Sequence, residues 1–563
     1  MSIVEVLKFG SSVLRSPDDL PIAVDEIYRR WRAGRRVLAV VSAFEGVTDR
    51  LLEESSQVFG ADCPEATAAY VATGEQRTAA LLSGALLRFG IPARLVCPRE
   101  ISLLACGSSL ESTPTQVDRC ALERLWDSHP VLVLPGFYGV DAAGRLALFG
   151  RGGSDISALF LAAQLRGHCR LLKDVRGVFD ADPAQSTRAR RFAALSWERA
   201  IEVAGPLIQA KALQYARRHS LPFEVGRPNE AACTQVGEPA DEWAAPAPDW
   251  RPLRIVLLGC GVVGRGVYEA VRRHPSRYQI AHVVVRDVAR HPGVAGLTAD
   301  LNVVLDDSID VVIECFDGSG LAYPLVSAAL FDGKFVITAN KAATTERWQA
   351  LSTYARGPDR RLWYSAAVGG ALPVIETIAT LSAEVLEIRG IVNGTCGVVL
   401  AALAQGSTHE EAIALARAGG FAETDVSRDL SGRDSADKLC LLIDAAFGAW
   451  MPPDDIATRG IDSLTDFAGG YQLIARARRG PLGITASVQP EIAPPESFLG
   501  QASGAENRIE IDLANGETIR LRGQGAGRWP TAVSVMGDLH EVARLAEGTR
   551  RAPAAARRVA ARC

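Results

Sequence analysis

Residues 253–264 read Leu-Arg-Ile-Val-Leu-Leu-Gly-Cys-Gly-Val-Val-Gly, and this stretch decides the fold of the second half of the chain. The branched apolar run predicts a buried parallel strand, and the Gly-x-Gly-x-x-Gly spacing after it predicts a tight turn into a helix. Backbone N–H groups at such a helix N-terminus bind the pyrophosphate of a dinucleotide. We therefore expect a Rossmann domain, whose cofactor contacts come from Gly259, Gly261, Val262, Val263 and Gly264.

Three more strands are expected downstream. The strand at 280–285 ends at Arg286-Asp287. An acidic residue at this point favours NAD and an arginine accommodates the 2′-phosphate of NADP, so we expect NADP, with NAD as the alternative. Strands at 311–314 and 335–338 follow, and the latter runs into Lys341, at the carboxyl end where ligands of parallel sheets bind.

A proline-rich linker precedes this half of the chain. Residues 237–252 contain four prolines in sixteen residues, which is typical of a stiff, extended connector. In residues 1–236, apolar strands at 3–7, 36–41, 130–135 and 171–175 alternate with glycine loops and helical segments. This alternation predicts another α/β sheet, with its loops gathered at one edge.

Length and composition exclude several classes of protein. The 563 residues correspond to about three to four domains. With a net charge of -4, the chain lacks the excess of basic charge that is typical of nucleic-acid-binding proteins. Eleven cysteines show no zinc spacing, which together with the lack of a signal peptide predicts a cytoplasmic protein. We see no apolar run of about 18 residues, so no contact with a membrane is expected.

Residues 421–439 carry an unusual density of charge in an otherwise apolar region. Glu423, Asp429 and Asp434 lie here, shortly before Lys438. Asp434 and Lys438 are four residues apart, so on a helix they share a face. A lysine held by a carboxylate stays protonated and can donate a proton to a carbonyl oxygen. A solvated, charged helix start is the alternative interpretation of the same residues.

The N-terminal motifs resemble one family. Lys-Phe-Gly from Lys8, Val-Ser-Ala-x-x-Gly-Val-Thr-Asp from Val41, Gly-Glu at Glu75, Gly-Arg-Gly-Gly-Ser-Asp from Gly150 and Asp-Val-x-Gly-Val from Asp174 occur in the order seen in aspartate kinase, of the amino acid kinase family. The resemblance implies transfer of the γ-phosphoryl group of ATP, with Mg²⁺, to the side chain of aspartate. It implies these site residues: Lys8 for the phosphoryl group; Ser42, Thr48, Glu75, Arg151 and Asp155 for the amino acid; Gly10, Ser11, Asp174 and Lys211 for the nucleotide.

This half departs from the family pattern at several points. Ser11 replaces a loop glycine, Arg176 replaces an aspartate, and the segment after Lys211 is shortened. The paired ACT regulatory modules expected after the kinase domain are missing, so we expect weak feedback inhibition by threonine or lysine. A kinase for another acid, such as glutamate, is a further hypothesis that a substrate panel would decide.

The later motifs resemble homoserine dehydrogenase. They are the fingerprint at 259–264, Ser-Ala-Ala-Val-Gly-Gly-Ala-Leu-Pro from Ser365, Val-Asn-Gly-Thr from Val392, the charged stretch, and the glycine-rich run from Gly523. The resemblance implies reduction of aspartate 4-semialdehyde to homoserine. Lys438 would donate the proton, Asp434 and Asp429 would orient lysine and substrate, and Glu423 would bind the substrate amino group. Lys341 and Gly525 would lie at the cofactor.

The same resemblance implies a metal ion and an oligomer. Family members often hold Na⁺ on backbone carbonyls, here those of Ser365, Val368, Gly370 and Leu372. A divalent metal at the carboxylates is an alternative that the chemistry does not require. We expect small-molecule substrates and a homodimer or homotetramer formed through the dehydrogenase domain. Arg428 stands where an acidic residue is common, and could tune affinity or face water.

The predicted architecture is α/β and multidomain. It comprises an amino acid kinase-like sandwich (1–236), the linker (237–252), the Rossmann domain (253–363), an α+β substrate and dimerisation domain (364–520), a return to the nucleotide-binding domain (521–545) and an Ala/Arg-rich tail (546–563) that we expect to fray. The leading hypothesis is a bifunctional kinase and dehydrogenase serving threonine and methionine biosynthesis. The alternative is a monofunctional homoserine dehydrogenase with an inactive kinase-like binding or scaffold domain.

Overall fold

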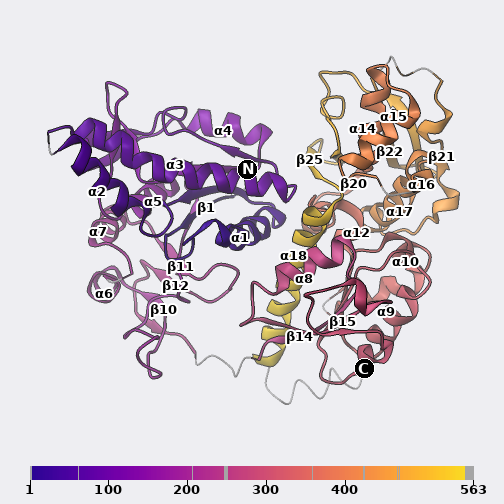
Figure 1. Cartoon of the computed structure of the whole chain (residues 1–563), viewed down its shortest axis with the longest axis horizontal. Coiled ribbons are helices and arrows are strands. Elements are labelled where there is room, and N and C mark those ends of the chain that lie inside the picture. The colour runs from indigo at the N-terminus through magenta and orange to yellow at the C-terminus, as the bar shows by residue number, and fades with distance from the viewer. Residues whose placement is uncertain are drawn as a thin grey trace. The chain divides into compact units, whose positions relative to one another are not determined.

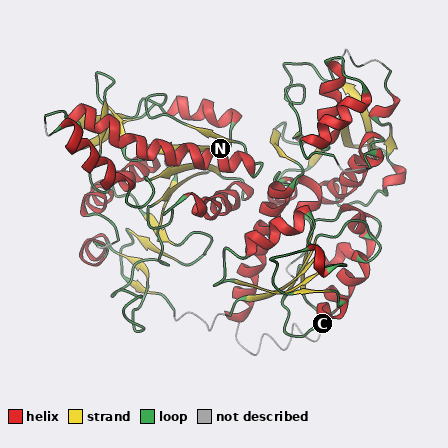
Figure 2. Ribbon diagram, in the orientation of Figure 1, coloured by secondary structure: helices red, strands yellow, loops and turns green. Residues whose placement is uncertain are grey.

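The chain folds into two compact units (Figures 1 and 2). The computed structural model describes residues 3–60, 62–205, 207–245, 251–357, 359–422, 425–465, 467 and 470–551. Apart from the short segment 88–91, the first unit ends at residue 248 and the second begins at 249. Both contain parallel sheets covered by helices, so the expected α/β multidomain class is confirmed.

The first unit is built on a nine-stranded sheet. Its strands, in order across the sheet, are β13 (Glu242–Trp243), β10 (Phe192–Leu195), β12 (Cys233–Val236), β11 (Phe223–Gly226), β9 (His168–Leu172), β1 (Val4–Phe9), β2 (Arg36–Val41), β6 (Val131–Pro135) and β3 (Ala93–Leu95). The run from β11 to β3 is parallel, so its carboxyl ends share one edge. The strand expected at 171–175 ends earlier, at Leu172, which leaves Lys173 and Asp174 in the loop at that edge.

Helices and a small second sheet cover this sheet. The helices are α1 (Leu20–Arg32), α2 (Val47–Phe59), α3 (Pro64–Arg88), α4 (Arg119–Ser128), α5 (Gly153–Leu165), α6 (Trp197–Val203) and α7 (Ala210–Arg218). The small sheet has the order β5 (Ser112–Gln116), β4 (Leu104–Gly107), β7 (Tyr138–Val140) and β8 (Leu146–Leu148). The buried face of α5 packs with Val6 and Leu38 of the large sheet in one core, which fixes the start of α5 beside the carboxyl ends of the strands.

The second unit contains a wholly parallel six-stranded sheet. Its order is β16 (Leu297–Thr298), β15 (Tyr278–Val284), β14 (Leu253–Leu258), β17 (Val311–Glu314), β18 (Phe335–Thr338) and β19 (Leu362–Trp363). Numbered along the chain, this is the order 3-2-1-4-5-6 of a Rossmann fold, in which the dinucleotide binds where the strand order reverses. The reversal lies at β14, the strand that opens the fingerprint.

Two helical layers bury this sheet. Ile255 and Leu257 share a core with α8 (Val262–Val271) and α18 (Arg528–Arg551), whereas Val256 and Leu258 face α9 (Ala322–Phe331). Alternate residues of a strand point to opposite faces, and a strand buried on both faces is apolar throughout. The long C-terminal helix α18 lies along α8 (Figure 1). The first residues of the predicted Ala/Arg-rich tail, 546–551, are helical and belong to α18, whereas residues 552–563 lie outside the described residues.

A second six-stranded sheet completes this unit. Its order is β21 (Ala457–Thr458), β23 (Gly483–Ile492), β22 (Tyr471–Gly480), β20 (Val385–Ile391), β24 (Glu506–Leu513) and β25 (Thr518–Gln524). The three strands expected at 484–494, 508–511 and 518–523 exist, but they do not all pair with one another. Strand β20, which the sequence did not reveal, lies between β22 and β24 and separates β23 from β24.

Helices connect the two sheets of the second unit, and α14 and α17 pack on the second sheet, which is antiparallel except for β21. They include α10 (Lys341–Thr345), α11 (Trp348–Leu351), α12 (Ser365–Gly369), α13 (Val374–Thr380), α14 (Gly394–Ala404), α15 (His409–Ala418), α16 (Ser427–Leu430) and α17 (Arg433–Phe447). Leu439 and Leu442 of α17 are buried in the same core as Leu473 and Ile509 of the sheet. This packing turns the first turns of α17 toward the end of β20.

Candidate active sites

The first candidate site lies at the start of α17. This helix begins after Gly432, whose positive φ of 81° permits the turn, and Asp434 lies in its first turn, where the helix dipole favours negative charge. The Lys438 Nζ is 2.9 Å from Asp434 Oδ2 and donates to the Val392 carbonyl at 2.6 Å. The contact predicted from the four-residue spacing is therefore present, and both side chains are almost fully buried.

Asp434 also contacts a second lysine. The Lys341 Nζ lies 3.1 Å from Asp434 Oδ1, and Lys341 is the first residue of α10, directly after β18. Burial opposes ionisation of Asp434, but the charges of Lys341 and Lys438 outweigh it and hold the pKa of this carboxyl well below its usual range. The Lys341 side chain is about one-third exposed, so it can contact a ligand while it keeps its ion pair with Asp434.

Asn393 belongs to the same cluster, although no role was predicted for it. Its Nδ2 donates to Asp429 Oδ1 at 2.7 Å and to Asp434 Oδ2 at 2.8 Å, while its Oδ1 accepts from the N–H of Cys396 as the N-cap of α14. Burial and the nearby charge of Asp434 raise the pKa of Asp429. An asparagine that caps a helix while bridging two carboxylates fixes both of them relative to Lys438.

Two other residues of the charged stretch are Glu423 and Arg428. Glu423 lies outside the described residues, so its predicted contact with the substrate amino group stays a prediction. Arg428 forms an ion pair with Asp437 and remains more than half exposed. Arg428 therefore pairs from the surface with the buried carboxylate of Asp437, three residues from Asp434.

The glycine fingerprint forms a tight turn between β14 and α8. Gly259 has a φ of +94°, and a Cβ on Gly264 would lie 2.2 Å from the Gly259 carbonyl oxygen. Gly261 caps α8, has open space beside it, and precedes Val262, which is 71% exposed. Val263 packs partly against the core of α8. A free helix N-terminus with close glycine backbone fits a dinucleotide pyrophosphate.

A buried carboxylate stands beside this turn at the end of β17. Glu314 accepts hydrogen bonds from the N–H of Phe316, the hydroxyl of Thr338 and the amide of Asn340. Burial raises its pKa to about 7. Asn340 in turn donates to the carbonyls of the 316–318 loop and caps α10. This network joins the carboxyl ends of β17 and β18 and fixes the start of α10, where Lys341 lies. It was not predicted from the sequence.

The residues that would choose between NAD and NADP lie after β15. Arg286 is exposed. The Asp287 carboxylate already accepts the N–H of Ala289 as a helix cap and pairs with Arg290 at 3.3 Å.

The loop expected to hold sodium lies against the C-terminal glycine run. Gly370 has a φ of +55°, and a Cβ on it would lie 2.6 Å from the backbone of Gly525. Ser365 and Val368 lie in α12, and the Leu372 carbonyl accepts the N–H of Val374 at 2.9 Å. Asn507 lies against Gly525, and its buried amide atoms have no hydrogen-bond partner within the described part of the chain. A buried side-chain oxygen without a partner beside Gly525 fits a water molecule or a cation.

The second candidate site lies in the first unit, at the carboxyl edge of its parallel sheet. Lys8 is the penultimate residue of β1, and its Nζ is 2.7 Å from Asp155 Oδ1 in the first turn of α5. Lys173, just after the adjacent strand β9, reaches Asp155 Oδ2 at 3.1 Å. Burial opposes ionisation of Asp155, but the two lysines lower its pKa to about 2. The sequence predicted Lys8 and Asp155 but gave Lys173 no role.

Glu75 of α3 is buried next to this cluster. Its Oε2 accepts the N–H groups of Gly136 and Phe137, each at 2.6 Å, and its Oε1 accepts the hydroxyl of Ser154 at 3.0 Å. Burial raises the pKa of Glu75 to about 7, against the opposing effects of these donors and Lys8. The carboxylate therefore fixes the turn after β6 as well as lying near Lys8.

The other predicted kinase residues differ in their exposure to solvent. Gly10 is buried and packs near the Lys8 ammonium, whereas Ser11, Arg151 and Asp174 are exposed and Ser42 and Thr48 are half-buried. Arg176, which replaces an aspartate of the family pattern, pairs with Glu230 at 2.7 Å.

Lys211 is not part of the buried cluster. Its ammonium pairs with Glu111 and donates to the carbonyls of Ser112 and Phe149 at 3.1 and 2.8 Å. The Glu111 carboxylate lies over Gly150, so that a Cβ on this glycine would overlap it. These contacts tie α7 to the glycine loop that carries Arg151.

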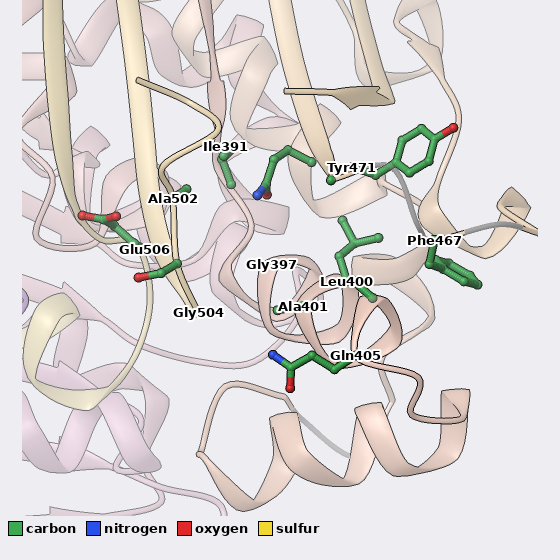
Figure 3. Close-up of a pocket in the computed structure, with 14 residues that line it drawn as sticks. Ile391, Gly397, Leu400, Ala401, Gln405, Phe467, Tyr471, Ala502, Gly504 and Glu506 are labelled. Atoms are coloured by element: carbon green, nitrogen blue, oxygen red, sulfur yellow. The ribbon is translucent and has the colours of Figure 1, made fainter. Parts of the chain in front are cut away.

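A cavity of about 340 Å³ lies in the second unit, between α14 and the antiparallel sheet (Figure 3). Ile391, Leu400 and Ala401 give it an apolar wall, and Gln405, Tyr471 and Glu506 lie at its margin. Its lining contains none of the candidate site residues.

The folds and sites together define the class of protein: a nicotinamide-dependent oxidoreductase on a Rossmann domain, joined to an α/β kinase domain. The family model "Homoserine dehydrogenase, NAD binding domain" matches residues 259–365, "Homoserine dehydrogenase" matches 373–540, and "Amino acid kinase family" matches 4–223. The chain belongs to the homoserine dehydrogenase family and carries an amino acid kinase domain before it. These matches favour the fused kinase and dehydrogenase over the monofunctional alternative.

Two relatives identified by sequence agree with this assignment, and one solved structure is similar over part of the chain. A homoserine dehydrogenase of Pseudomonas aeruginosa is 34% identical over 319 residues, which cover 52% of this chain and 73% of that protein. One from Bacillus subtilis is 32% identical and covers 51% and 72%. The crystal structure of a homoserine dehydrogenase from Thiobacillus denitrificans has 29% identity and a TM-score of 0.49, with 54% of this chain and 76% of that chain covered. In the described part of the chain, no helix is long and apolar enough to cross a membrane.

Proposed function

We propose that the second unit reduces aspartate 4-semialdehyde to homoserine with NADPH, reversibly. The observation that carries the proposal is the buried Lys438 ammonium, which lies 2.9 Å from a carboxylate of strongly lowered pKa. A carboxylate that stays ionised keeps its lysine protonated, as a proton donor to an aldehyde oxygen must be. The bound nicotinamide supplies the hydride, and the chain supplies orientation and the proton.

The remaining residues of the cluster orient lysine and substrate. Asn393 holds Asp429 and Asp434 at hydrogen-bond distance, so Asp429 can face the substrate while Asp434 faces Lys438. We assign the substrate ammonium group to Asp429 and Glu423. Lys341, which contacts Asp434 and follows β18, lies between the substrate and the nucleotide edge of the sheet.

The finer preference for NADP rests on the loop after β15. Because Asp287 is engaged in a helix cap and an ion pair, it is less available to ribose hydroxyls, whereas exposed Arg286 can contact a 2′-phosphate. A Na⁺ ion on the carbonyls around Gly370 would stabilise the contact of this loop with Gly525. The proton-transfer step does not need that ion.

For the first unit we propose phosphorylation of aspartate by ATP with Mg²⁺. The buried ammonium of Lys8, held by Asp155, supports neutralisation of charge on the transferred phosphoryl group. Arg151 is exposed on the glycine loop and can bind the aspartate carboxylate as a bidentate donor. Gly10, Ser11, Asp174 and Lys211 are assigned to the nucleotide, and Ser42, Thr48 and Glu75 to the amino acid.

Strand β13 lies within the predicted linker 237–252 and pairs with β10, so the first domain extends past its predicted boundary at 236. We further propose that this first domain and the segments 253–363 and 364–520 act as separate domains, and that 521–545 return to the nucleotide-binding domain. We also propose that the dehydrogenase domain forms a cytoplasmic homodimer or homotetramer. Continuity of α18 with the core of α8 supports the return. Light scattering of the purified chain tests the oligomer, and a monomer would contradict it.

The proposed dehydrogenase is tested by NADPH oxidation with aspartate 4-semialdehyde, and in reverse by homoserine oxidation with NADP⁺ and NAD⁺. We expect turnover in both directions and a lower KM for NADP⁺. Other short aldehydes serve as controls. Equal turnover of an aldehyde that lacks the amino and carboxylate groups would contradict the assigned substrate.

A further inference from the structure

One buried cluster in the first unit contains more positive than negative charge. Asp155 bridges the ammonium groups of Lys8 and Lys173 at 2.7 and 3.1 Å, and the three residues are 4–7% exposed. Buried charges are costly unless they are paired, so an unbalanced pair of cations is expected where an anion binds. Glu75 lies near Lys8, but because burial raises its pKa to about 7 it offsets this excess only in part at neutral pH.

The topology places Lys173 where a phosphate chain would lie. Strands β1 and β9 are adjacent and parallel, with Lys8 opposite Leu171 and Phe9 opposite Leu172. Lys173 therefore follows the strand that flanks Lys8, at the carboxyl edge where ligands of such sheets bind. The next residue, Asp174, is exposed, so the cluster lies just beneath the surface on the nucleotide side.

The use of lysine in this chain gives independent support. Lysine occurs at six positions, whereas lysine and arginine together number 61. Of the five lysines other than Lys173, four were assigned to candidate sites on separate grounds: Lys8, Lys211, Lys341 and Lys438. Arginine and lysine differ in shape and hydration, and only lysine offers a compact point charge. A chain that otherwise uses arginine thus has lysine mainly where a small ammonium group is needed.

Lys211, the other lysine assigned to the nucleotide, does not duplicate this role. It is engaged by Glu111 and two backbone carbonyls, outside the cluster that contains Lys8. Lys173 is the lysine that shares a carboxylate with Lys8.

We propose that Lys173 is a second phosphate-binding catalytic residue of the kinase site, acting with Lys8 on the phosphate chain of ATP. The inference rests on the proposed kinase function. In the step, a carboxylate oxygen of the amino acid forms a bond to the γ-phosphorus, and the bond from that phosphorus to the β,γ-bridging oxygen breaks. ADP leaves with the electron pair and an acyl phosphate forms. Lys173 stabilises the charge that accumulates on the β-phosphate side, and Lys8 stabilises the transferred group.

The test uses the full-length chain and the variants Lys173→Met, Lys173→Arg and Lys334→Met. Lys334 is the matched control, since it is a buried lysine that pairs with Asp332 before β18. ATP-dependent aspartyl-hydroxamate formation gives kcat and KM, and calorimetry gives the Kd for ATP. Homoserine oxidation in the same samples reports the folding of the second unit, and circular dichroism with thermal unfolding reports that of the first.

We expect Lys173→Met to lower kcat about 100-fold and to weaken ATP binding, with the KM for aspartate little changed. Lys173→Arg should recover only part of the loss, because the buried site fits an ammonium group, and Lys334→Met should match the wild type. Kinase activity and ATP affinity of Lys173→Met within threefold of wild type would overturn the proposal.

The same data separate this inference from the proposed kinase function. If the wild type binds ATP but phosphorylates no acid, the kinase function fails, and the Kd of Lys173→Met still decides whether Lys173 binds phosphate. If the wild type does not bind ATP, both fail.

Discussion

At the scale of single residues, we propose Lys438 as the proton donor of the dehydrogenase. Its ammonium group is buried between the Asp434 carboxylate and the Val392 carbonyl. We predict that Lys438→Met lowers kcat for homoserine oxidation by on the order of 100-fold or more. The Kd for NADPH, measured by fluorescence, should stay within about threefold, because this side chain is not expected to bind the dinucleotide. Near-wild-type turnover would remove Lys438 from the proton-donor role.

We predict that Glu75 makes the kinase reaction depend on pH. Burial raises its pKa to about 7, so its carboxylate is ionised above this pH and protonated below it. If it binds the substrate ammonium group, the KM for aspartate should fall as pH rises, and one pH unit below the pKa only about a tenth of the sites are ionised. Kinetics across neutral pH measure this change. In Glu75→Gln the KM should be high and flat over the same range, and an unchanged slope would assign the titration to another group.

Many residues of both sites could be predicted from the sequence, but most of the side chains that hydrogen-bond or pair with them could not. The spacing of Asp434 and Lys438 predicted a contact that is present, because helical geometry fixes it locally. Asn393, Glu314 and Lys173 were missed because their partners lie far away in sequence. Asn393 reaches Asp429 and Asp434 across 36 and 41 residues, and only the packing of α14 against α17 brings them together.

At the scale of elements, the turn between β14 and α8 sets the cofactor site. A Cβ on Gly264 would lie 2.2 Å from the Gly259 carbonyl oxygen, so the turn cannot keep its shape with any side chain there. We predict that Gly264→Ala weakens NADPH binding at least tenfold while ATP-dependent kinase activity persists. Gly84→Ala, on an exposed turn of α3 with open space around it, is the matched control and should alter neither activity. Unchanged NADPH affinity in Gly264→Ala would contradict the proposed pyrophosphate site.

The sequence predicted elements better than their pairing. The strand, glycine turn and helix at 253–271 and the apolar helix from Leu439 are present because their patterns are local. Strand β20 was missed, since Val385–Ile391 carries glutamate, arginine and glycine among its apolar residues. Those charges are satisfied within the sheet, where Arg389 pairs with Glu510 and Asp512. Cross-strand ion pairs of this kind cannot be recognised before the pairing is known.

At the scale of the whole molecule, a kinase domain and a dehydrogenase share one chain without ACT modules between them. The resemblance to aspartate kinase associates feedback by threonine or lysine with those modules, so we predict that millimolar threonine or lysine inhibits neither activity by more than about twofold. Both reactions measured with and without each amino acid check this. Strong inhibition of either activity would show that a regulatory site exists elsewhere in the chain.

The central claim is that two working active sites occupy one polypeptide, and one assay tests it most directly. ATP-dependent aspartyl-hydroxamate formation and homoserine oxidation are measured in the same preparation of the full-length chain, Lys8→Ala and Lys438→Ala. We predict that the wild type performs both reactions, that Lys8→Ala loses only the first and that Lys438→Ala loses only the second. Homoserine oxidation without any hydroxamate formation in the wild type would contradict the claim and leave the first unit a kinase fold with another role.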